Sequence, residues 1–436
     1  MFAETRSSSG PWAAPYAAAP VDARVCVPGS KSMTNRALVL AAISDGSSRI
    51  EAPLRARDTE LMAEALRAMG IEITEDSDGS WIVIPRRLVG PASIDCGLSG
   101  TVLRFAPPVA ALAHGSVRFD GDLRIRERPN RPLLVALREL GVAIDDGGRG
   151  AAPFVVRGIG RLAGGSVRTS AADSSQFISG LLLAAARFDN GVEVIADGTV
   201  PSAPYLEMNV AMLRERGVRV DAEPGRWVVH PGPVRAHDTR IEPDLSNAAP
   251  FAAAALVTGG KVTIPAWPQT TTQPGAQLPR WLTAMGAHCA VTGEGLTVTG
   301  GSAIHGLDAD LGEFSELVPV LAALAVLADS PSRLTGVAHI RGHETDRITA
   351  LATELSACGA EVDELPDGLV IRPRGLHGRL FGTYDDHRLV MAAAVLGLAV
   401  EGIQVAGAAT VAKTMPDFTQ RWDAMLGNGA SGAATG

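Results

Sequence analysis

The 436-residue chain has few aromatic side chains, few cysteines and no excess of positive charge. Phe, Trp and Tyr make up 4% of the residues, whereas 46% of the residues are hydrophobic and 48 are glycine. Small aliphatic side chains in this proportion suit helices that pack closely on sheets. The net charge is −8, from 39 basic and 47 acidic residues, so we expect no nucleic acid as a partner.

The chain also lacks the sequence features of a secreted or membrane protein. Its start has no basic leader followed by an apolar segment, and its longest apolar run, Leu317–Ala328, is too short to cross a bilayer. That run predicts a buried helix. We therefore expect a cytoplasmic protein with no membrane partner, and flexible tails at residues 1–20 and 428–436. The four cysteines are far apart, form no CxxC pair and suit a reducing compartment: Cys26, Cys96, Cys289 and Cys358.

Two common enzyme motifs are absent as well. No GxxxxGK[ST] phosphate-binding loop occurs, and HETDR (343–347) lacks the second histidine of the zinc-protease motif HExxH. The sequence therefore excludes an ordinary nucleotide-binding loop and that type of zinc enzyme.

A pattern of helix, glycine and short strand recurs through the chain at steps of about 70 residues. In each copy an apolar stripe of helical period ends at a glycine, the residue most typical of a helix C-terminus. After the first five copies, a turn rich in Asp, Gly or Pro leads into a second strand, which predicts a hairpin. The glycines are Gly70, Gly141, Gly217, Gly286, Gly359 and Gly427.

These copies predict an α/β protein of six related units in two groups of three. Any α/β protein shows this pattern several times, but the even spacing favours true repetition. No second strand follows the sixth unit, and the N-terminal strand ARVCVPG (23–29) is the candidate to complete it. The chain would then cross twice between two globular domains. The predicted domains are 29–242, and 21–28 together with 243–427.

Cationic and hydroxyl side chains gather at predicted helix starts in the first half. PGSKS (28–32) combines a glycine turn with Lys31 and Ser32, and Arg36 follows one helical turn later. Helix N-terminal amides and cationic side chains together favour a bound anion. Helix caps and a solvated charged loop remain the alternatives. Three further stretches carry cationic or hydroxyl side chains: GLSGTVLRF (97–105), RIRERPNRP (124–132) and DSSQF (173–177).

In the second half, carboxylates accompany the cations at helix starts. Glu316 lies at the edge of a predicted buried helix, and Glu344 lies in HETDR. The triplet 386–388 (DHR) directly precedes an entirely apolar helix, and Lys413 precedes the last helix. If these helix starts face one cleft, their charges would select a small, highly anionic ligand. Carboxylates in such a positive field suit proton transfer.

Seven motifs, in order along nearly the whole chain, resemble the 5-enolpyruvylshikimate-3-phosphate synthase family (3-phosphoshikimate 1-carboxyvinyltransferases) of enolpyruvyl transferases. They are PGSKSMTNRALVLAA, GLSGTVLRF, RERP, DSSQF, HETDR, DDHR and AKTMPDF. The resemblance implies an enolpyruvyl-transferase fold: two inside-out α/β domains, each of three repeated helix-strand units, joined by two crossover segments. We expect a monomer.

The implied reaction belongs to the shikimate pathway of aromatic amino acid biosynthesis. The enolpyruvyl group of phosphoenolpyruvate passes to the 5-hydroxyl of shikimate 3-phosphate, and phosphate leaves after a tetrahedral ketal has formed. The resemblance implies no metal and no organic cofactor. Both substrates are phosphorylated, which agrees with the cations and helix starts found above.

The resemblance also implies a role for each matching residue. The residues implied to bind shikimate 3-phosphate are Lys31, Ser32, Arg36, Ser174, Ser175, Gln176, Ser202, Glu316 and His343. The residues implied to bind phosphoenolpyruvate are Lys31, Gly100, Arg128, Gln176, Arg347, Arg388 and Lys413. The residues implied to be catalytic are Lys31, Glu316, which takes the 5-hydroxyl proton, and Glu344, which exchanges protons with the methylene carbon.

At three positions the sequence departs from the usual family pattern. Glu316 stands where many members have aspartate, which keeps the chemistry but lengthens the reach of the carboxylate. His343 stands where many have lysine, so the sequence predicts a local charge that depends on pH. Leu98 stands where asparagine is frequent, and we assign it no polar role.

Two other functions are weighed against this one. A sister enzyme, UDP-N-acetylglucosamine 1-carboxyvinyltransferase, typically has PGxKN and a reactive cysteine in a mobile loop, whereas this chain has PGSKS and no cysteine in GDLRIRERPN (121–130). A non-catalytic anion-binding protein of the same fold is disfavoured because the charged site residues are intact. A phosphate-release assay separates the three functions.

Overall fold

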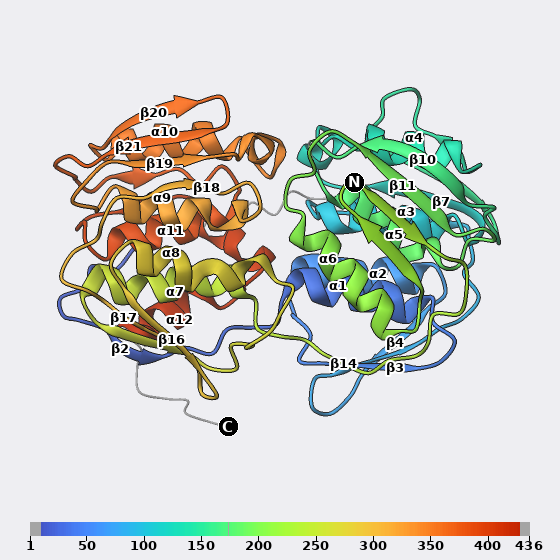
Figure 1. Cartoon of the computed structure of the whole chain (residues 1–436), viewed down its shortest axis with the longest axis horizontal. Helices are drawn as coiled ribbons and strands as arrows, with labels where there is room; N and C mark the ends of the chain where they lie inside the picture. The colour runs from blue at the N-terminus through green and yellow to red at the C-terminus, as the bar shows by residue number, and fades with distance from the viewer. Residues whose placement is uncertain (1–9, 173, 428–436) are drawn as a thin grey trace. The chain divides into compact units, whose positions relative to one another are not determined.

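The computed structural model describes residues 10–172 and 174–427 of the 436-residue chain. The chain divides into two compact units, each of which is described by itself. In Figure 1 one unit, called here the inserted unit, is mainly blue to green, and the other, the terminal unit, is mainly yellow to red. The inserted unit comprises Pro28–Glu242 with Thr272–Pro274, and the terminal unit comprises the described parts of Met1–Val27, Pro243–Thr271 and Gly275–Gly436.

The inserted unit contains three four-stranded sheets. Its strands are β3 (Ser48–Glu51), β4 (Glu72–Glu75), β5 (Trp81–Ile84), β6 (Ala92–Asp95), β7 (His114–Asp120), β8 (Ala143–Asp145), β9 (Phe154–Ile159), β10 (Gly165–Ser170), β11 (Val192–Asp197), β12 (Val220–Glu223), β13 (Arg226–Val229) and β14 (Thr239–Arg240). The sheet orders are β14-β3-β5-β4, β6-β7-β9-β8 and β10-β11-β13-β12. In each sheet the first two strands are parallel, and a hairpin adds the other two in antiparallel pairing.

The terminal unit repeats this topology in two four-stranded sheets and adds a third sheet of three strands. Its strands are β1 (Trp12–Ala13), β2 (Asp22–Arg24), β15 (Lys261–Ile264), β16 (His288–Thr292), β17 (Gly295–Thr299), β18 (Asp308–Asp310), β19 (Ser332–Thr335), β20 (Glu361–Leu365), β21 (Gly368–Arg372), β22 (Leu380–Phe381) and β23 (Gln404–Val405). The sheets have the orders β16-β17-β15-β2, β18-β19-β21-β20 and β1-β23-β22. The six predicted repeats and all five predicted hairpins are therefore present.

Each repeat contributes one helix directly before the inner of its two parallel strands and one before its hairpin position. The first kind comprises α1 (Lys31–Ala42), α3 (Gly100–Ala110), α5 (Gln176–Ala185), α7 (Leu245–Thr258), α9 (Val318–Ala325) and α11 (His387–Gly397). The second kind comprises α2 (Arg57–Ala68), α4 (Arg131–Glu139), α6 (Pro204–Glu215), α8 (Leu278–Ala284), α10 (Arg347–Ala357) and α12 (Phe418–Met425). Short 3-10 helices are η1 (Leu123–Arg126), η2 (Pro274–Gln277), η3 (Ser315–Leu317), η4 (Ala338–Gly342) and η5 (Ala408–Lys413).

The helices of the first kind form the centre of each unit. Every residue of α3, α9 and α11 is buried, and each unit has its own hydrophobic cluster. In Figure 1, α9 and α11 lie between the sheet of β19 to β21 and the sheet of β2, β16 and β17. With helices inside and sheets outside, each unit has the predicted inside-out arrangement, and the apolar run at Leu317–Ala328 forms buried helix α9 as predicted.

The six predicted glycines follow the six helices of the second kind. Each adopts the left-handed conformation, with φ between 73° and 108°. A left-handed residue ends the helix, and backbone N–H groups after it donate to the last helical carbonyl groups. A residue with a Cβ atom would be strained in this conformation. The list is Gly70, Gly141, Gly217, Gly286, Gly359 and Gly427.

One predicted strand pairing is wrong. The strand within ARVCVPG, β2, pairs in parallel with β15, so it belongs to the first repeat of the terminal unit and not to the last. The last repeat is completed instead by β1, which pairs antiparallel with β23. The inserted unit therefore interrupts the repeat that begins with β2 and continues with α7.

The predicted tail at residues 1–20 is also wrong in its second part. Residues 10–20 contain β1, Ala14 is buried, and its backbone N–H donates to the carbonyl of Ile403 at 3.0 Å. Trp12 packs edge-on against Phe418 with ring centroids 6.2 Å apart, which anchors this segment to the core. The remaining tail predictions, at residues 1–9 and 428–436, lie outside the described residues.

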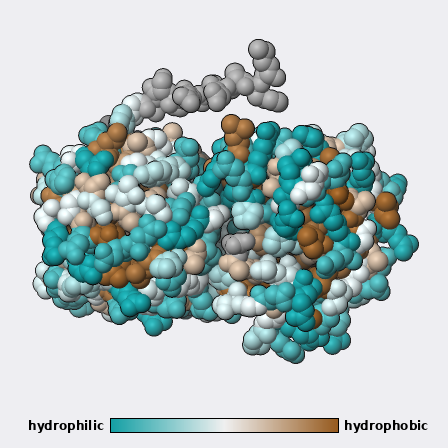
Figure 2. Space-filling model, turned by 90° about the horizontal axis from the view of Figure 1, so that it is seen from above, coloured by the Kyte–Doolittle hydropathy of each residue, from teal (hydrophilic) through white to brown (hydrophobic). Residues whose placement is uncertain are grey.

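Within the described residues, the helices are too short or too polar to cross a membrane. Figure 2 shows hydrophobic residues in small separate groups on the face in view, surrounded by hydrophilic ones. The cysteines at positions 26, 96, 289 and 358 are all free thiols, as expected.

Candidate functional site

The starts of three buried helices come together in the inserted unit. Asn35 Nδ2 of α1 donates to Thr101 Oγ1 of α3 at 2.6 Å, which joins the N-terminal parts of these helices. Arg104 Nη1 of α3 donates to Gln176 Oε1 of α5 at 2.8 Å. Because these bonds join residues within the first five of each helix, the partial positive charges of three helix N-termini are concentrated in one region. We call this region the first cluster: Lys31, Ser32, Arg36, Gly100, Arg104, Arg128, Ser174, Ser175, Gln176 and Ser202.

Arg36 lies buried within the first cluster. Its guanidinium donates to Asn209 Oδ1, and Nη1 donates to the carbonyl of Ser32 at 3.0 Å. The rings of Phe105 and Tyr205 lie 5.0 and 5.6 Å from its Cζ. Burial lowers the pKa of Arg36 to about 10, so the side chain still carries its charge at neutral pH. A cation held against two rings is well placed to receive an anion.

The guanidinium groups of Arg104 and Arg128 lie over the start of α3. A Cβ atom on Gly100 would lie 2.9 Å from Arg104 Nη1 and 3.0 Å from Arg128 Nη1. Arg128 also donates to the carbonyl of Leu98 at 3.3 Å, and Arg104 to that of Pro129 at 3.1 Å. Glycine at position 100 thus lets two cations approach the helix N-terminus. Leu98 takes part through its backbone carbonyl, which accepts the hydrogen bond from Arg128.

Lys31 opens α1 and forms an ion pair with Asp58 in the first turn of α2. The distance from Nζ to Oδ2 is 3.4 Å, and the Asp58 side chain is 2% exposed. The sequence analysis did not identify Asp58, although it stands at a predicted helix start as the other site residues do. Arg104 was noticed there only as part of a motif.

The predicted serines all lie at helix starts. Ser174 Oγ accepts a hydrogen bond from the backbone N–H of Gln176 at 3.2 Å, so it forms a turn directly before the N-cap of α5. Ser175 is buried at the same helix start, and Ser32 lies in the first turn of α1. Ser202 is buried with a left-handed φ of 52° directly before α6. Residue 173 of the DSSQF motif lies outside the described residues.

In the terminal unit, Arg347 is the centre of a second cluster. Its guanidinium donates to Asp386 at 2.7 and 3.3 Å, to Glu344 Oε2 at 2.8 Å and to Glu316 Oε2 at 3.2 Å. Nη1 also lies 3.0 Å from Nδ1 of His343. Burial opposes the charge of Arg347, but the three carboxylates outweigh it and raise its pKa. The second cluster comprises Glu316, His343, Glu344, Arg347, Asp386, Arg388 and Lys413.

Cations and carboxylates alternate through the second cluster. Glu316 lies between Arg347 and Arg388, whose Nη1 also donates to the Glu316 carbonyl at 3.1 Å. Glu344 lies between Arg347 and Lys413. All of these side chains are buried or half-buried, so their charges are little screened by water. The arrangement provides cations for anionic groups and carboxylates for proton transfer in one place.

The second cluster shifts the pKa values of two of its members, Glu316 and His343. Burial favours the neutral form of Glu316, but Arg388 and Arg347 outweigh it and hold the pKa of this carboxyl well below its usual value. Glu316 is therefore ionised at neutral pH, which is the form that accepts a proton. For His343, burial and the charge of Arg347 both lower the pKa well below its usual value.

The prediction of a pH-dependent charge at His343 is therefore corrected. Because Nδ1 faces the Arg347 guanidinium, the ring is neutral and accepts a hydrogen bond at neutral pH. His339 packs edge-on against it, with ring centroids 5.8 Å apart, and its Nε2 lies 2.9 Å from Ser315 Oγ. The sequence analysis missed His339, for which no motif gave a signal.

Within residues 10–172 and 174–427, the histidines, cysteines and carboxylates form no group of three or more that could hold a metal ion. Both clusters combine helix N-termini with Lys and Arg side chains. The second cluster also contains carboxylates. Such surroundings suit a phosphorylated, carboxylated small molecule.

Sequence comparison identifies one matching family. The family model "EPSP synthase (3-phosphoshikimate 1-carboxyvinyltransferase)" matches residues 15–422. A 3-phosphoshikimate 1-carboxyvinyltransferase of Kocuria rhizophila is 50% identical over 432 residues, which cover 96% of this chain and 97% of the relative.

Solved structures give the same result for the fold. An EPSP synthase from Acinetobacter baumannii has a TM-score of 0.80 and 25% identity, with 96% of this chain and 98% of that chain covered. The enolpyruvyl transferase NikO from Streptomyces tendae has a TM-score of 0.73 and 18% identity, with 94% and 96% covered. These likenesses confirm the enolpyruvyl-transferase fold that the sequence predicted.

Proposed function

Since the chain belongs to the EPSP synthase family, we propose how its two clusters serve the reaction of a 3-phosphoshikimate 1-carboxyvinyltransferase. The family assignment makes the chain a transferase of the shikimate pathway, as its motifs predicted. The observation that supports the division of roles best is the second cluster, where buried carboxylates and cations alternate around Arg347.

In the inserted unit, the first cluster supplies donors for phosphate groups. Arg36 offers a buried, charged guanidinium beside Ser179 and Tyr205, and the start of α5 offers Gln176. Serine hydroxyls and helix N-terminal amides complete such a site. The residues assigned to shikimate 3-phosphate are Lys31, Ser32, Arg36, Ser174, Ser175, Gln176 and Ser202. The residues of this unit assigned to phosphoenolpyruvate are Lys31, Gly100, Arg128 and Gln176.

In the terminal unit, the second cluster supplies charge and proton transfer. Arg347, Arg388 and Lys413 are assigned to the anionic groups of phosphoenolpyruvate, where they also stabilise the departing phosphate. Glu316 is assigned to the 5-hydroxyl of shikimate 3-phosphate, with His343 beside it as a neutral hydrogen-bonding group. The ionised state of Glu316 supports its role as the base.

The steps follow from these assignments. The methylene carbon of phosphoenolpyruvate gains a proton through Glu344, and the neighbouring carbon becomes cationic. The 5-hydroxyl oxygen adds to that carbon while Glu316 takes its proton, which gives the tetrahedral ketal. Loss of phosphate, with transfer of one methyl proton back to Glu344, then restores the double bond. Carboxylates near the developing cation and cations near the phosphate stabilise charge where it forms.

The two substrates are the small molecules of the family reaction, and a monomer in the cytoplasm is part of the proposal. Phosphate release from phosphoenolpyruvate tests it with two alternative acceptors. Release that requires shikimate 3-phosphate is expected. Release that requires UDP-N-acetylglucosamine instead would support the sister enzyme, and no release with either acceptor would support a binding protein.

A further inference from the structure

A strained turn leads into α11 and carries the residues that hold Arg347 and Arg388. Between β22 and α11, Tyr384 and Asp385 follow each other with φ of 50° and 58°. Left-handed backbone is unfavourable for residues that have a Cβ atom, and bulky side chains adopt it least readily. Two such residues in succession persist only where the surrounding structure holds them, and such turns concentrate at functional sites.

The turn ends at Asp386 and so determines where this carboxylate lies. Asp386 Oδ1 accepts from the backbone N–H of Arg388 at 2.8 Å, and both carboxylate oxygens accept from Arg347. Both arginines are buried, with exposed fractions of 1% for Arg347 and 7% for Arg388. A change in the turn would therefore move two cations of the second cluster together.

A second contact joins the turn to α10. The hydroxyl of Tyr384 donates to Glu354 Oε1 at 2.7 Å. Glu354 follows Arg347 by seven residues on α10, which is two helical turns, so both side chains leave the same face of the helix. Helix α10 thus contacts the turn at two positions. Arg347 binds Asp386, and Glu354 binds Tyr384.

Glu354 is poorly explained by stability alone. It is 6% exposed, and its Oε2 has no hydrogen-bond partner among the described residues. A buried carboxylate oxygen without a partner is unfavourable, so such groups usually serve a purpose beyond packing. A Cβ atom at Gly382 would lie 2.7 Å from Glu354 Oε1, so the backbone of the turn fits closely around this carboxylate.

The other side of the turn is held by the segment that carries Lys413. Thr410 Oγ1, in η5, donates to the carbonyl of Asp385 at 2.9 Å, and Thr383 Oγ1 donates to the carbonyl of Ala406 at 2.6 Å. The turn is thus held by elements that carry Arg347 and Lys413, and it leads directly to Arg388. Its conformation is coupled to all three cations of the second cluster.

We propose that Tyr384 and Glu354 are positioning residues for the transferase reaction. Their hydrogen bond holds the left-handed turn, the turn places Asp386, and Asp386 aligns Arg347 and Arg388 for the anionic groups of phosphoenolpyruvate. This inference rests on the roles proposed above for the two arginines.

Three substitutions at position 384 test the inference in the full-length chain, with phosphate release from both substrates as the readout. Tyr384→Phe removes only the hydroxyl, and we expect KM for phosphoenolpyruvate to rise at least about fivefold while KM for shikimate 3-phosphate changes less than about twofold. Tyr384→Ala should raise KM for phosphoenolpyruvate at least as much. Tyr384→Gly removes the side chain and also the left-handed strain, so its KM should return toward the wild-type value.

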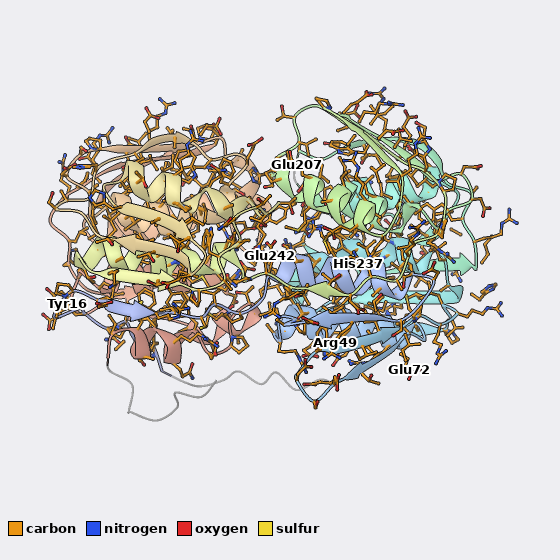
Figure 3. The ribbon with its side chains drawn as sticks, turned by 60° about the horizontal axis from the view of Figure 1, so that its bottom comes forward. Tyr16, Arg49, Glu72, Glu207, His237 and Glu242 are labelled. Carbon is orange, nitrogen blue, oxygen red and sulfur yellow. The ribbon has the colours of Figure 1, made fainter. Side chains whose placement is uncertain are left out.

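The comparison of glycine with alanine separates positioning from a general structural role. Glycine ordinarily weakens a structure relative to alanine, so recovery by glycine is specific to a residue whose task is to hold left-handed backbone. Tyr16→Phe is the matched control, because Figure 3 shows Tyr16 at the edge of the same unit and the residue is 52% exposed. It should leave both KM values unchanged.

Two outcomes would overturn the inference: a wild-type KM for phosphoenolpyruvate in Tyr384→Phe, or a glycine variant no better than the alanine variant. If the wild-type chain and the Tyr16→Phe control release no phosphate, the proposed function is wrong and the inference falls with it. Phosphate release by the wild type and by Tyr16→Phe therefore distinguishes a failure of the positioning inference from a failure of the proposed function.

Discussion

Arg347 and Asp386 are joined by two hydrogen bonds, of 2.7 and 3.3 Å, although 39 residues separate them in the chain. Arg347 opens α10 and Asp386 caps α11, so the contact joins two repeats of the terminal unit. A guanidinium has a planar set of donors that matches a carboxylate, whereas an ammonium is a point charge. The centre of the second cluster therefore depends on arginine in particular.

Replacing this arginine should damage function even when charge is kept. Arg347→Lys cannot contact Glu316, Glu344 and Asp386 at once, so at least one buried carboxylate loses its partner. We expect kcat/KM for phosphoenolpyruvate to fall at least about 100-fold, and the free energy of unfolding to fall by about 2 to 4 kcal/mol. Steady-state phosphate release and denaturant unfolding measure the two effects.

The matched control for that variant is Arg333→Lys, because Arg333 is exposed on β19 of the same unit. Its kcat/KM for phosphoenolpyruvate should stay within about twofold of the wild-type value. Its free energy of unfolding should stay within about 0.5 kcal/mol of that of the wild type. Equal effects of the two substitutions would contradict the central role of Arg347.

A methyl group at Gly100 should alter binding more than stability. In Gly100→Ala, the added Cβ would press on the guanidinium ends of Arg104 and Arg128, which are flexible enough to move aside. Displacing these cations from the start of α3 should raise KM for phosphoenolpyruvate about tenfold or more. Alanine favours a helix over glycine, so the free energy of unfolding should change by less than about 1 kcal/mol.

Gly232→Ala serves as the control for that substitution, because a Cβ atom there would meet no atom within 4 Å. Its KM for phosphoenolpyruvate should equal that of the wild type. If Gly100→Ala also kept the wild-type KM, the proposed phosphoenolpyruvate role of this helix start would be wrong.

The neutral state of His343 gives a prediction for pH. Its pKa is lowered in the folded chain, so the unfolded chain binds more protons below pH 6.5. The stability contributed by the neutral ring is therefore fully present above about pH 6.5 and decreases as the pH falls below it, by at most about 1.4 kcal/mol per pH unit. Unfolding of wild type and His343→Gln at pH 8 and pH 5 measures this, and the wild type should lose more stability.

The same reasoning predicts that His343 does not shape the activity profile at higher pH. Between pH 7 and 8.5, His343→Gln and the wild type should show parallel kcat/KM curves, because the ring does not titrate there. A wild-type transition near pH 7 that disappears in the variant would show that the ring does titrate in that range.

Local patterns in the sequence were sufficient to predict the repeats and the helix starts. Helical period followed by a left-handed glycine is a property of neighbouring residues, and it located the helix ends at Gly70, Gly141 and the later glycines. Strand pairing is not local in this sense. Both β1 and β2 lie in the first 30 residues, and β1 has only two residues, so no pattern indicated that β1 completes the sixth sheet.

The same distinction holds for the site. Lys31, Arg347 and Arg388 could be proposed because they lie in recognisable motifs at helix starts. Asp58 and His339 could not, because their importance comes from contacts with residues far away in the chain. Burial beside Arg347 likewise decides the charge of His343, and no sequence pattern reports it.

Substitution by the matching amide tests whether Glu316 is the base. Glu316→Gln keeps the shape of the side chain and a hydrogen-bond acceptor for Arg347, but an amide cannot take a proton. We expect kcat to fall about 100- to 10,000-fold, the usual contribution of a positioned acid or base, while KM for both substrates changes less than about threefold. Because the pKa of Glu316 is held well below its usual value, the wild type should keep this base ionised throughout pH 5 to 8.

Glu313→Gln is the control, because Glu313 is exposed three residues earlier and should tolerate the same change with full activity. Acidification adds an independent check, since a depressed pKa means that the ion pairs of Glu316 are lost only as the pH falls well below 4.5. A wild-type kcat in Glu316→Gln would remove Glu316 from the base role and leave the carboxylate as a partner for Arg347 and Arg388 only.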